Sequence, residues 1–232
     1  MKYAAIVRRA ALSAALAGIA VTPLHADGTL VPGGTIGAQV FKAGSGNLFV
    51  RYLGAQAMYT NDLYFYLTLG GPGQFLFRNQ TATPGTTVEV TSSAGLATGA
   101  ETIFSICSNL GGAAPGTGCT SANQYFMGPG SRNPDTQFHA AVWTRDAYIA
   151  GCAAVPSSCN ADGLASLLAD PTFDLVIGFE DSFNYNIDSD FNDVVFAVRG
   201  ASTVPEPMTM ALLATGLAGM SGASMIRRRK RG

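Results

Sequence analysis

The sequence predicts an all-β protein in which residues 27–203 form a single antiparallel β-sandwich of jelly-roll-like type. Short runs rich in β-branched and aromatic residues are separated by clusters of Gly, Pro, Ser and Asn, and 28 of the 232 residues are Gly, which is typical of sandwiches and barrels. No long stretch has the apolar period of a helix. Only 12% of the residues are charged, which excludes a coiled coil and an acidic disordered chain. There is no internal repeat, so we expect one domain between two terminal segments.

Eight runs in this span are expected to be strands. The run Leu63–Leu69 has the clearest period of two, because Leu or Phe at the odd positions alternates with Tyr or Thr at the even ones. One short helix is expected at Ala161–Leu168, with Asp162 as its N-cap. The expected strands are Asn47–Tyr52, Leu63–Leu69, Gln74–Phe77, Thr86–Thr91, Glu101–Ser105, Phe138–Trp143, Phe173–Gly178 and Val194–Arg199.

The first 26 residues have the pattern of a secretory signal peptide. Lys2, Arg8 and Arg9 form a basic start, Ala10–Thr22 is an uncharged apolar run, and Ala26 offers a small residue for cleavage. The alternative is an uncleaved membrane anchor, but the run is shorter than the roughly 20 residues that a spanning helix needs. The pattern therefore predicts export through the inner membrane.

The C-terminal segment, residues 204–232, has three parts. Pro205, Glu206 and Pro207 form a stiff, non-helical start, since proline fixes φ and lacks an N–H donor. An uncharged stretch of 19 residues, 208–226, is long enough to span a membrane. The basic residues 227–231 place the end of the chain on the cytoplasmic side.

The order of these parts resembles a PEP-CTERM sorting tail over residues 204–231. That family's tail is recognised by an exosortase, a membrane cysteine protease of Gram-negative bacteria that make extracellular polysaccharide. The resemblance implies an exosortase substrate with a membrane-anchored precursor, held transiently in the inner membrane through 208–226. After sorting, the protein would be at the cell surface or in an extracellular biofilm matrix. The simpler alternative is a single-pass membrane anchor that has no role in sorting.

Four cysteines occur as two close pairs, Cys107 with Cys119 and Cys152 with Cys159. An even number in an exported chain indicates disulfide bonds, and local pairing is the simplest of the three possible connectivities. A zinc site is the competing interpretation. Neither pair has the close C-x₂₋₄-C spacing of zinc modules, so structural disulfides are expected.

The charge is divided between the body and the ends of the chain. Residues 27–204 contain six basic and 14 acidic residues, which leaves a net charge of −8, whereas most basic residues lie at the two ends. A region with this net negative charge repels phosphate groups. The charge argues against a nucleic-acid partner and favours cations.

The acidic residues are densest between the last two expected strands, where five carboxylates fall within the 14 residues 180–193. This charge density costs Coulomb energy unless a cation neutralises it, and oxygen ligands without His or Cys favour Ca²⁺ over Mg²⁺. The alternative is a solvated turn in which Asp and Asn satisfy backbone donors. The candidate calcium ligands are Glu180, Asp181, Asp188, Asp190, Asn192 and Asp193.

The spacing Asp188-x-Asp190-x-Asn192 matches the start of an EF-hand loop, but the rest does not. Position six is Asp193 instead of Gly, position twelve is Arg199 instead of Glu, and a strand is expected to follow. A calcium site here would therefore lie on a β-hairpin, with ligands from both ends of the loop.

The same region resembles the end of a DUF4114 domain. Val176–Asp181 matches that family's GFED element, and Asp188–Phe196 matches its D-x-D-[FY]-N-D element with the last strand. Weaker likeness extends to Asn133–Asp135, His139–Ala140 and Phe77–Gly85, so the resemblance spans roughly 45–200. The chain departs from the family at Ser182–Ile187, which lacks the usual glycines, and at Thr136, where Gly is common. The resemblance implies a secreted or surface-associated protein with a calcium-type site and without an assigned catalytic activity.

Catalysis is not expected. After removal of the signal peptide the only histidine is His139, which would share a strand face with Ala141 and Trp143 and is expected to be structural. The chain contains no G-x-S-x-G, H-E-x-x-H or phosphate-binding glycine motif.

The leading hypothesis is a non-enzymatic, calcium-stabilised extracellular matrix or surface protein. One alternative is a carbohydrate-binding module for exopolysaccharide, whose aromatic side chains would stack on sugars. A second is a glycan-active enzyme that uses His139 or a carboxylate pair. The candidate stacking residues are Tyr52, Tyr59, Tyr64, Tyr66, Tyr125 and Trp143.

Overall fold

The computed structural model describes residues 29–181 and 189–203. The expected signal peptide, the sorting tail with Pro205, Glu206 and Pro207, and the loop residue Asp188 lie outside these ranges. In the described part of the chain, no helix is long and apolar enough to cross a membrane.

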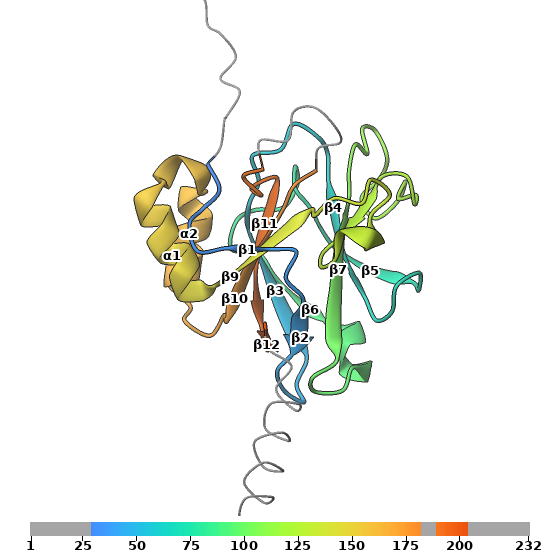
Figure 1. The fold of residues 1–232 in the computed structure, drawn as a ribbon, viewed down its shortest axis with the longest axis horizontal. Coiled ribbons are helices and arrows are strands. Elements are labelled where there is room, and N and C mark those ends of the chain that lie inside the picture. Colours follow the sequence, from blue (N-terminus) through green and yellow to red (C-terminus); the bar gives the residue numbers. More distant parts are fainter. Residues whose placement is uncertain (1–28, 182–188, 204–232) are drawn as a thin grey trace, which may run out of the picture.

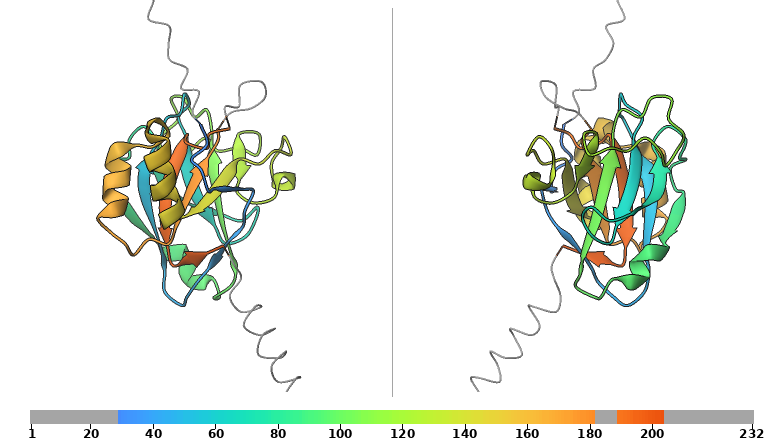
Figure 2. Two further views of the ribbon diagram at one scale, coloured as in Figure 1. Left: turned by 60° about the vertical axis from the view of Figure 1, so that its left-hand side comes forward. Right: turned by 90° about the vertical axis from the view of Figure 1, so that its right-hand side faces the viewer.

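The described residues form two antiparallel sheets that face each other, as the sequence predicts (Figures 1 and 2). The first has the order β1 (Thr35–Ile36), β9 (Ala140–Thr144), β10 (Leu175–Phe179), β11 (Val194–Arg199), β3 (Leu48–Gly54) and β6 (Thr87–Val90). The second has the order β12 (Ala201–Ser202), β2 (Val40–Lys42), β7 (Glu101–Cys107), β4 (Asp62–Tyr66) and β5 (Gly73–Arg78), with β8 (Gln124–Phe126) also paired to β7.

The main core lies between the two sheets, because each strand turns alternate side chains inward. In β4, Leu63 and Phe65 point into this core, whereas Tyr64 and Tyr66 pack in a separate cluster on the outer face of the second sheet. The period of two read from the sequence is therefore confirmed. The expected strand Leu63–Leu69 ends early, at Tyr66, and Leu67 and Leu69 are exposed in the turn that follows.

Two helices cover the outer face of the first sheet (Figure 1). The predicted helix α2 has the bounds Ala161–Leu168, but its N-cap is Asn160, whose Oδ1 accepts from Gly163 N at 2.9 Å. The expectation that Asp162 is the cap was wrong by two positions. Helix α1 (Arg145–Ala154) was not predicted; the Thr144 side chain caps it. Three short 3₁₀ helices complete the described helical segments: Thr91–Gly95, Gly130–Arg132 and Pro156–Ser158.

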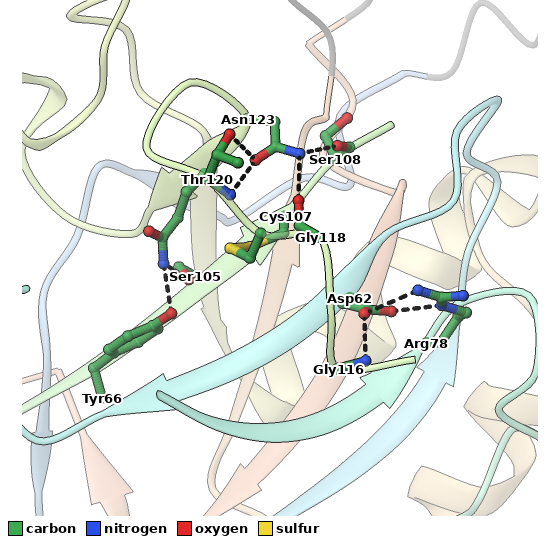
Figure 3. Close-up of a disulfide and its surroundings, with 12 residues drawn as sticks. Asp62, Tyr66, Arg78, Ser105, Cys107, Ser108, Gly116, Gly118, Thr120 and Asn123 are labelled. Carbon is green, nitrogen blue, oxygen red and sulfur yellow. Dashed lines mark hydrogen bonds and ion pairs between the residues drawn. A yellow bond between two sulfur atoms is a disulfide. The ribbon is translucent and has the colours of Figure 1, made fainter. Parts of the chain in front are cut away.

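Both predicted disulfides are present, each within its local pair. The Cys152–Cys159 bond ties helix α1 to the turn before α2. The Cys107–Cys119 bond holds the segment after β7 over the outer face of the second sheet (Figure 3). In that segment, Gly116 N donates to Asp62 Oδ2 at 2.8 Å, and Asp62 in turn pairs with Arg78.

Candidate metal centre

The candidate centre lies at the end of the β10–β11 hairpin. Phe179 and Val194 are the last residue pair of this ladder, so Glu180 and Asp193 leave the sheet side by side. The Asp193 N–H donates to Phe179 O at 3.1 Å, and the Glu180 N–H donates to His139 O, in front of β9, at 3.0 Å. The sheet therefore fixes the backbone of both acidic residues.

Three of the six predicted ligands come together at this point. Glu180, Asp181 and Asp193 each offer a carboxylate oxygen, and these oxygens all lie within 4.8 Å of one another. Their residues are only 2%, 4% and 9% exposed, respectively. One Asp193 oxygen also accepts a hydrogen bond of 2.7 Å from Asp181 N. Both ends of the loop thus contribute, as the sequence analysis expected.

Burial and the neighbouring Asp181 carboxylate raise the pKa of Asp193 to about 8. The physical cause is that buried carboxylates a few ångströms apart cannot all ionise without a compensating charge. Asp193 also has side-chain hydrogen-bond interactions with both Glu180 and Asp181. Asp193 therefore holds a proton at pH values where exposed carboxylates have none, and a bound cation would replace that proton.

The other two described candidates, Asp190 and Asn192, pair with each other. Asp190 accepts from the Asn192 backbone N–H at 3.1 Å and from the Asn192 side-chain amide. Between them, Phe191 is only 3% exposed and packs in the apolar cluster under the helices. This arrangement is an Asp-led turn anchored by a phenylalanine. The D-x-D-F-N-D sequence thus serves partly to shape the turn, and the carboxylate cluster does not include Asp190.

The second sheet adds two polar side chains that the sequence analysis did not identify. Asn61, immediately before β4, is fully buried and donates from Nδ2 to Asp181 Oδ2. Ser108, immediately after β7, donates from Oγ to Asp181 O at 3.1 Å. Asn61 is 120 residues from Asp181 in the chain, so no local motif joins them. Only the packing of the two sheets against each other brings them together.

His139 lies beside the cluster with both ring nitrogens within hydrogen-bond distance of protein oxygens. It is completely buried, its Nδ1 lies 2.9 Å from Glu180 O, and its Nε2 lies 2.8 Å from Asp135 Oδ2. Burial by itself would raise the pKa of Asp135, but hydrogen bonds from Gln137 N and His139 lower it below its usual value. The ring stacks on Tyr125, with centroids 4.0 Å apart.

The predicted face of His139 was wrong. Strand β9 begins only at Ala140, and the His139 ring contacts Tyr125, which belongs to the core between the sheets. Ala141 and Trp143 instead pack under the helices. His139 therefore lies on the opposite side of the first sheet from these two residues.

Five of the six aromatic residues proposed for sugar stacking are buried. Tyr52, Tyr64, Tyr66, Tyr125 and Trp143 are at most 8% exposed, and only Tyr59 is substantially exposed, at 41%. The five buried aromatic residues pack inside the fold and present no ring face to a sugar.

A groove of about 540 Å³ opens elsewhere, between the edges of the two sheets. No charged side chain and none of the candidate metal ligands lines it in the described structure. The lining residues are Gly33, Thr35, Ala38, Gln39, Phe41, Val142, Thr144 and Thr203.

No family model matches the chain, and comparisons with curated proteins and with solved structures give no match. The resemblances to a PEP-CTERM tail and to DUF4114 therefore stay predictions from the sequence.

Proposed function

We propose that this chain is an exported, non-enzymatic matrix or surface protein whose β-sandwich is stabilised by Ca²⁺. The observation that carries the proposal is the convergence of Glu180, Asp181 and Asp193 at the end of one hairpin, buried and within 4.8 Å of one another. The cation would neutralise this cluster and hold the two strand ends together.

The chemistry of the ligands favours Ca²⁺. The cluster offers oxygen atoms only, and hard oxygen ligands without nitrogen or sulfur suit Ca²⁺ and Mg²⁺. Mg²⁺ requires a near-octahedral shell and retains several waters, whereas Ca²⁺ accepts six to eight ligands in flexible geometry. Three carboxylates that the fold holds on two backbone segments therefore fit the flexible shell of Ca²⁺ better.

Two features support the export part of the proposal. Disulfide bonds form and persist in oxidising compartments, and both cysteine pairs are bonded. The signal-like residues 1–26 and the tail 204–231, which resembles a substrate of exosortase, favour secretion followed by sorting.

The test is thermal unfolding of the purified exported protein, first in EDTA and then across a CaCl₂ titration. A ligand that binds only the folded state adds about 2.7 kcal/mol of stability at 100 times its Kd. We expect a saturable rise in Tm that is smaller with MgCl₂. An unchanged Tm at millimolar Ca²⁺ would contradict the proposal and make the cluster a proton-sharing structural turn.

The second candidate function is binding of a neutral polysaccharide, and the groove favours it. Its volume lies in the range of about 300–1,000 Å³ of small-molecule sites. Threonine hydroxyls and the Gln39 amide offer hydrogen bonds, and Phe41 offers an apolar face. Affinity electrophoresis in gels that contain neutral polysaccharides is the test. Equal retardation of the wild type and a Gln39→Ala, Phe41→Ala variant would contradict this assignment.

A further inference from the structure

We propose that Asn61 is a ligand of the same cation, so that the ion bridges the two sheets of the sandwich. This inference rests on the proposed function, because it requires that the cluster of Glu180, Asp181 and Asp193 binds Ca²⁺. It adds a ligand from a distant part of the chain and assigns the ion a role beyond the hairpin.

The backbone fixes Asn61 at the cluster. Its N–H donates to Asn79 Oδ1 at 3.0 Å, and its carbonyl accepts from Asn79 N at 3.0 Å. The side chain is fully buried, and its Nδ2 donates to Asp181 Oδ2. The amide is therefore directed at a cluster carboxylate by two backbone hydrogen bonds and one side-chain hydrogen bond.

The Asn61 carbonyl oxygen, Oδ1, has no hydrogen-bond partner among the residues that the structure describes. Buried side-chain oxygens nearly always have a partner, because they lose hydration on folding. Nδ2 and Oδ1 share one carbon, so this oxygen is close to the Asp181 carboxylate. A cation in the cluster would supply the missing partner.

The amide carries both a donor and an acceptor that can face the carboxylates. In this structure Nδ2 faces them, since it donates to Asp181 Oδ2. A half-turn about the terminal side-chain torsion exchanges the nitrogen and the oxygen. After that turn, Oδ1 faces the carboxylates and coordinates the ion as amide oxygens do in calcium sites.

The consequence is a connection between the sheets. Glu180, Asp181 and Asp193 extend from β10 and β11 of the first sheet, whereas Asn61 leads into β4 of the second. Ser108, which follows β7 of the second sheet, already binds Asp181 O at 3.1 Å. A cation shared by Asn61 and the carboxylates would thus close this end of the sandwich.

The experiment is isothermal titration of CaCl₂ into the wild-type exported protein and into an Asn61→Ala variant. We expect Asn61→Ala to weaken calcium binding by at least about tenfold, as removal of a metal's supporting group does. The matched control is Asn47→Ala, which removes an exposed amide that bonds only to Glu89 in the described structure, and it should bind like the wild type. If the wild type and Asn61→Ala bind calcium with equal affinity, the bridge between the sheets is overturned and the proposed function is not. A wild type that binds no calcium would overturn the proposed function itself.

A second variant, Asn61→Asp, keeps the side-chain shape and covers the case in which Asn61→Ala does not fold. A fourth carboxylate should lower Tm in EDTA through like-charge repulsion and raise calcium affinity, which increases with ligand charge. The rise in Tm from EDTA to saturating CaCl₂ should therefore exceed that of the wild type. An equal or smaller rise would overturn the assignment of Asn61 as a ligand.

Discussion

At the scale of single residues, Gly178 allows the acidic turn to lie against strand β10. A Cβ atom at this position would lie 2.1 Å from the carbonyl oxygen of Phe191. That atom belongs to the backbone of a buried residue and cannot move aside as a flexible side chain would. The glycine of the GFED element therefore supports the turn sterically, without being a ligand.

We predict that Gly178→Ala lowers the free energy of unfolding by about 1–3 kcal/mol, as overpacking in a dense core does. The control is Gly46→Ala, because a Cβ atom at Gly46 meets no atom within 4 Å, and this variant should be near neutral. Urea unfolding of both variants measures the difference. Equal stabilities would show that the turn does not lie against Gly178.

The pKa of Asp193 predicts how stability depends on pH without calcium. Burial and Asp181 raise the pKa of Asp193 to about 8, above the value of about 3.9 of an unfolded aspartate. The folded chain thus binds the proton more tightly, so this stabilisation is complete below about pH 4 and is lost as the pH rises through about 8. In EDTA, we expect the free energy of unfolding to fall over this window, by at most about 1.4 kcal/mol per pH unit for one proton.

The Asp193→Asn variant isolates the contribution of the Asp193 carboxyl group, because asparagine does not ionise. Urea unfolding in EDTA at several pH values should give a flatter profile for this variant than for the wild type. Saturating calcium should also flatten the wild-type profile, because the ion replaces the bound protons. Parallel wild-type and Asp193→Asn profiles in EDTA would show that Asp193 does not hold the proton.

At the scale of elements, a buried ion pair joins β4, β5 and the disulfide-bonded segment. Arg78 Nε lies 2.7 Å from Asp62 Oδ1, and the Asp62 side chain is completely buried. Asp62 also accepts from Gly116 N, as Figure 3 shows. Arg78 donates in addition to the carbonyls of Ala113 and Ala114. The hydrogen bond to Asp62 raises the pKa of the Arg78 guanidinium further, so the guanidinium stays charged.

We predict that Asp62→Ala destabilises the fold by about 3–5 kcal/mol, because it leaves the Arg78 charge buried without its partner. Asp146→Ala is the control, since Asp146 is 91% exposed in its pair with Arg145 and exposed pairs contribute about 0–1 kcal/mol. Urea unfolding measures both. A loss below 1 kcal/mol for Asp62→Ala would mean that water reaches Arg78.

The sequence predicted those elements that have a strong period of their own. Val194–Arg199 and Ala161–Leu168 were predicted with their observed bounds, because each is a continuous apolar pattern. Helix α1 was missed because its buried stripe, Tyr148, Gly151 and Cys152, has helical spacing but contains a glycine and a cysteine, which are weak helix formers. The strands β1, β2, β8 and β12 are two or three residues long and depend on their partners.

The candidate site was predicted only in part, because only some of its residues are close to one another in the sequence. Glu180, Asp181 and Asp193 are near one another in sequence, so their charge density could be seen directly. The role of Asp190 and Asn192 in shaping the turn depends on Phe191 packing into the core. Asn61 gave no signal, because a single asparagine 120 residues away has no local pattern.

At the scale of the whole molecule, the candidate metal centre and the last described residues lie at opposite ends of the sandwich. The centre lies where β11 begins, at Val194, whereas β12 follows the other end of β11, at Arg199, and is labelled at the bottom of Figure 1. The end of the described chain at Thr203 therefore lies away from the candidate metal centre.

The bridge between the sheets predicts which amides calcium protects from hydrogen exchange. In the wild type, CaCl₂ should slow exchange at Asp181 and Asp193 on the hairpin and also at Asn61 in front of β4, because one ion holds all three backbones. In Asn61→Ala with saturating CaCl₂, protection should remain at the hairpin and be lost around residue 61. Exchange measured by mass spectrometry with EDTA and with CaCl₂ separates the two regions. The Leu48–Val50 amides, at the start of β3, report global unfolding and should exchange equally in both proteins once global stability is matched. Protection confined to the hairpin of the wild type would mean that the ion stabilises one turn and leaves the two sheets independent at that end.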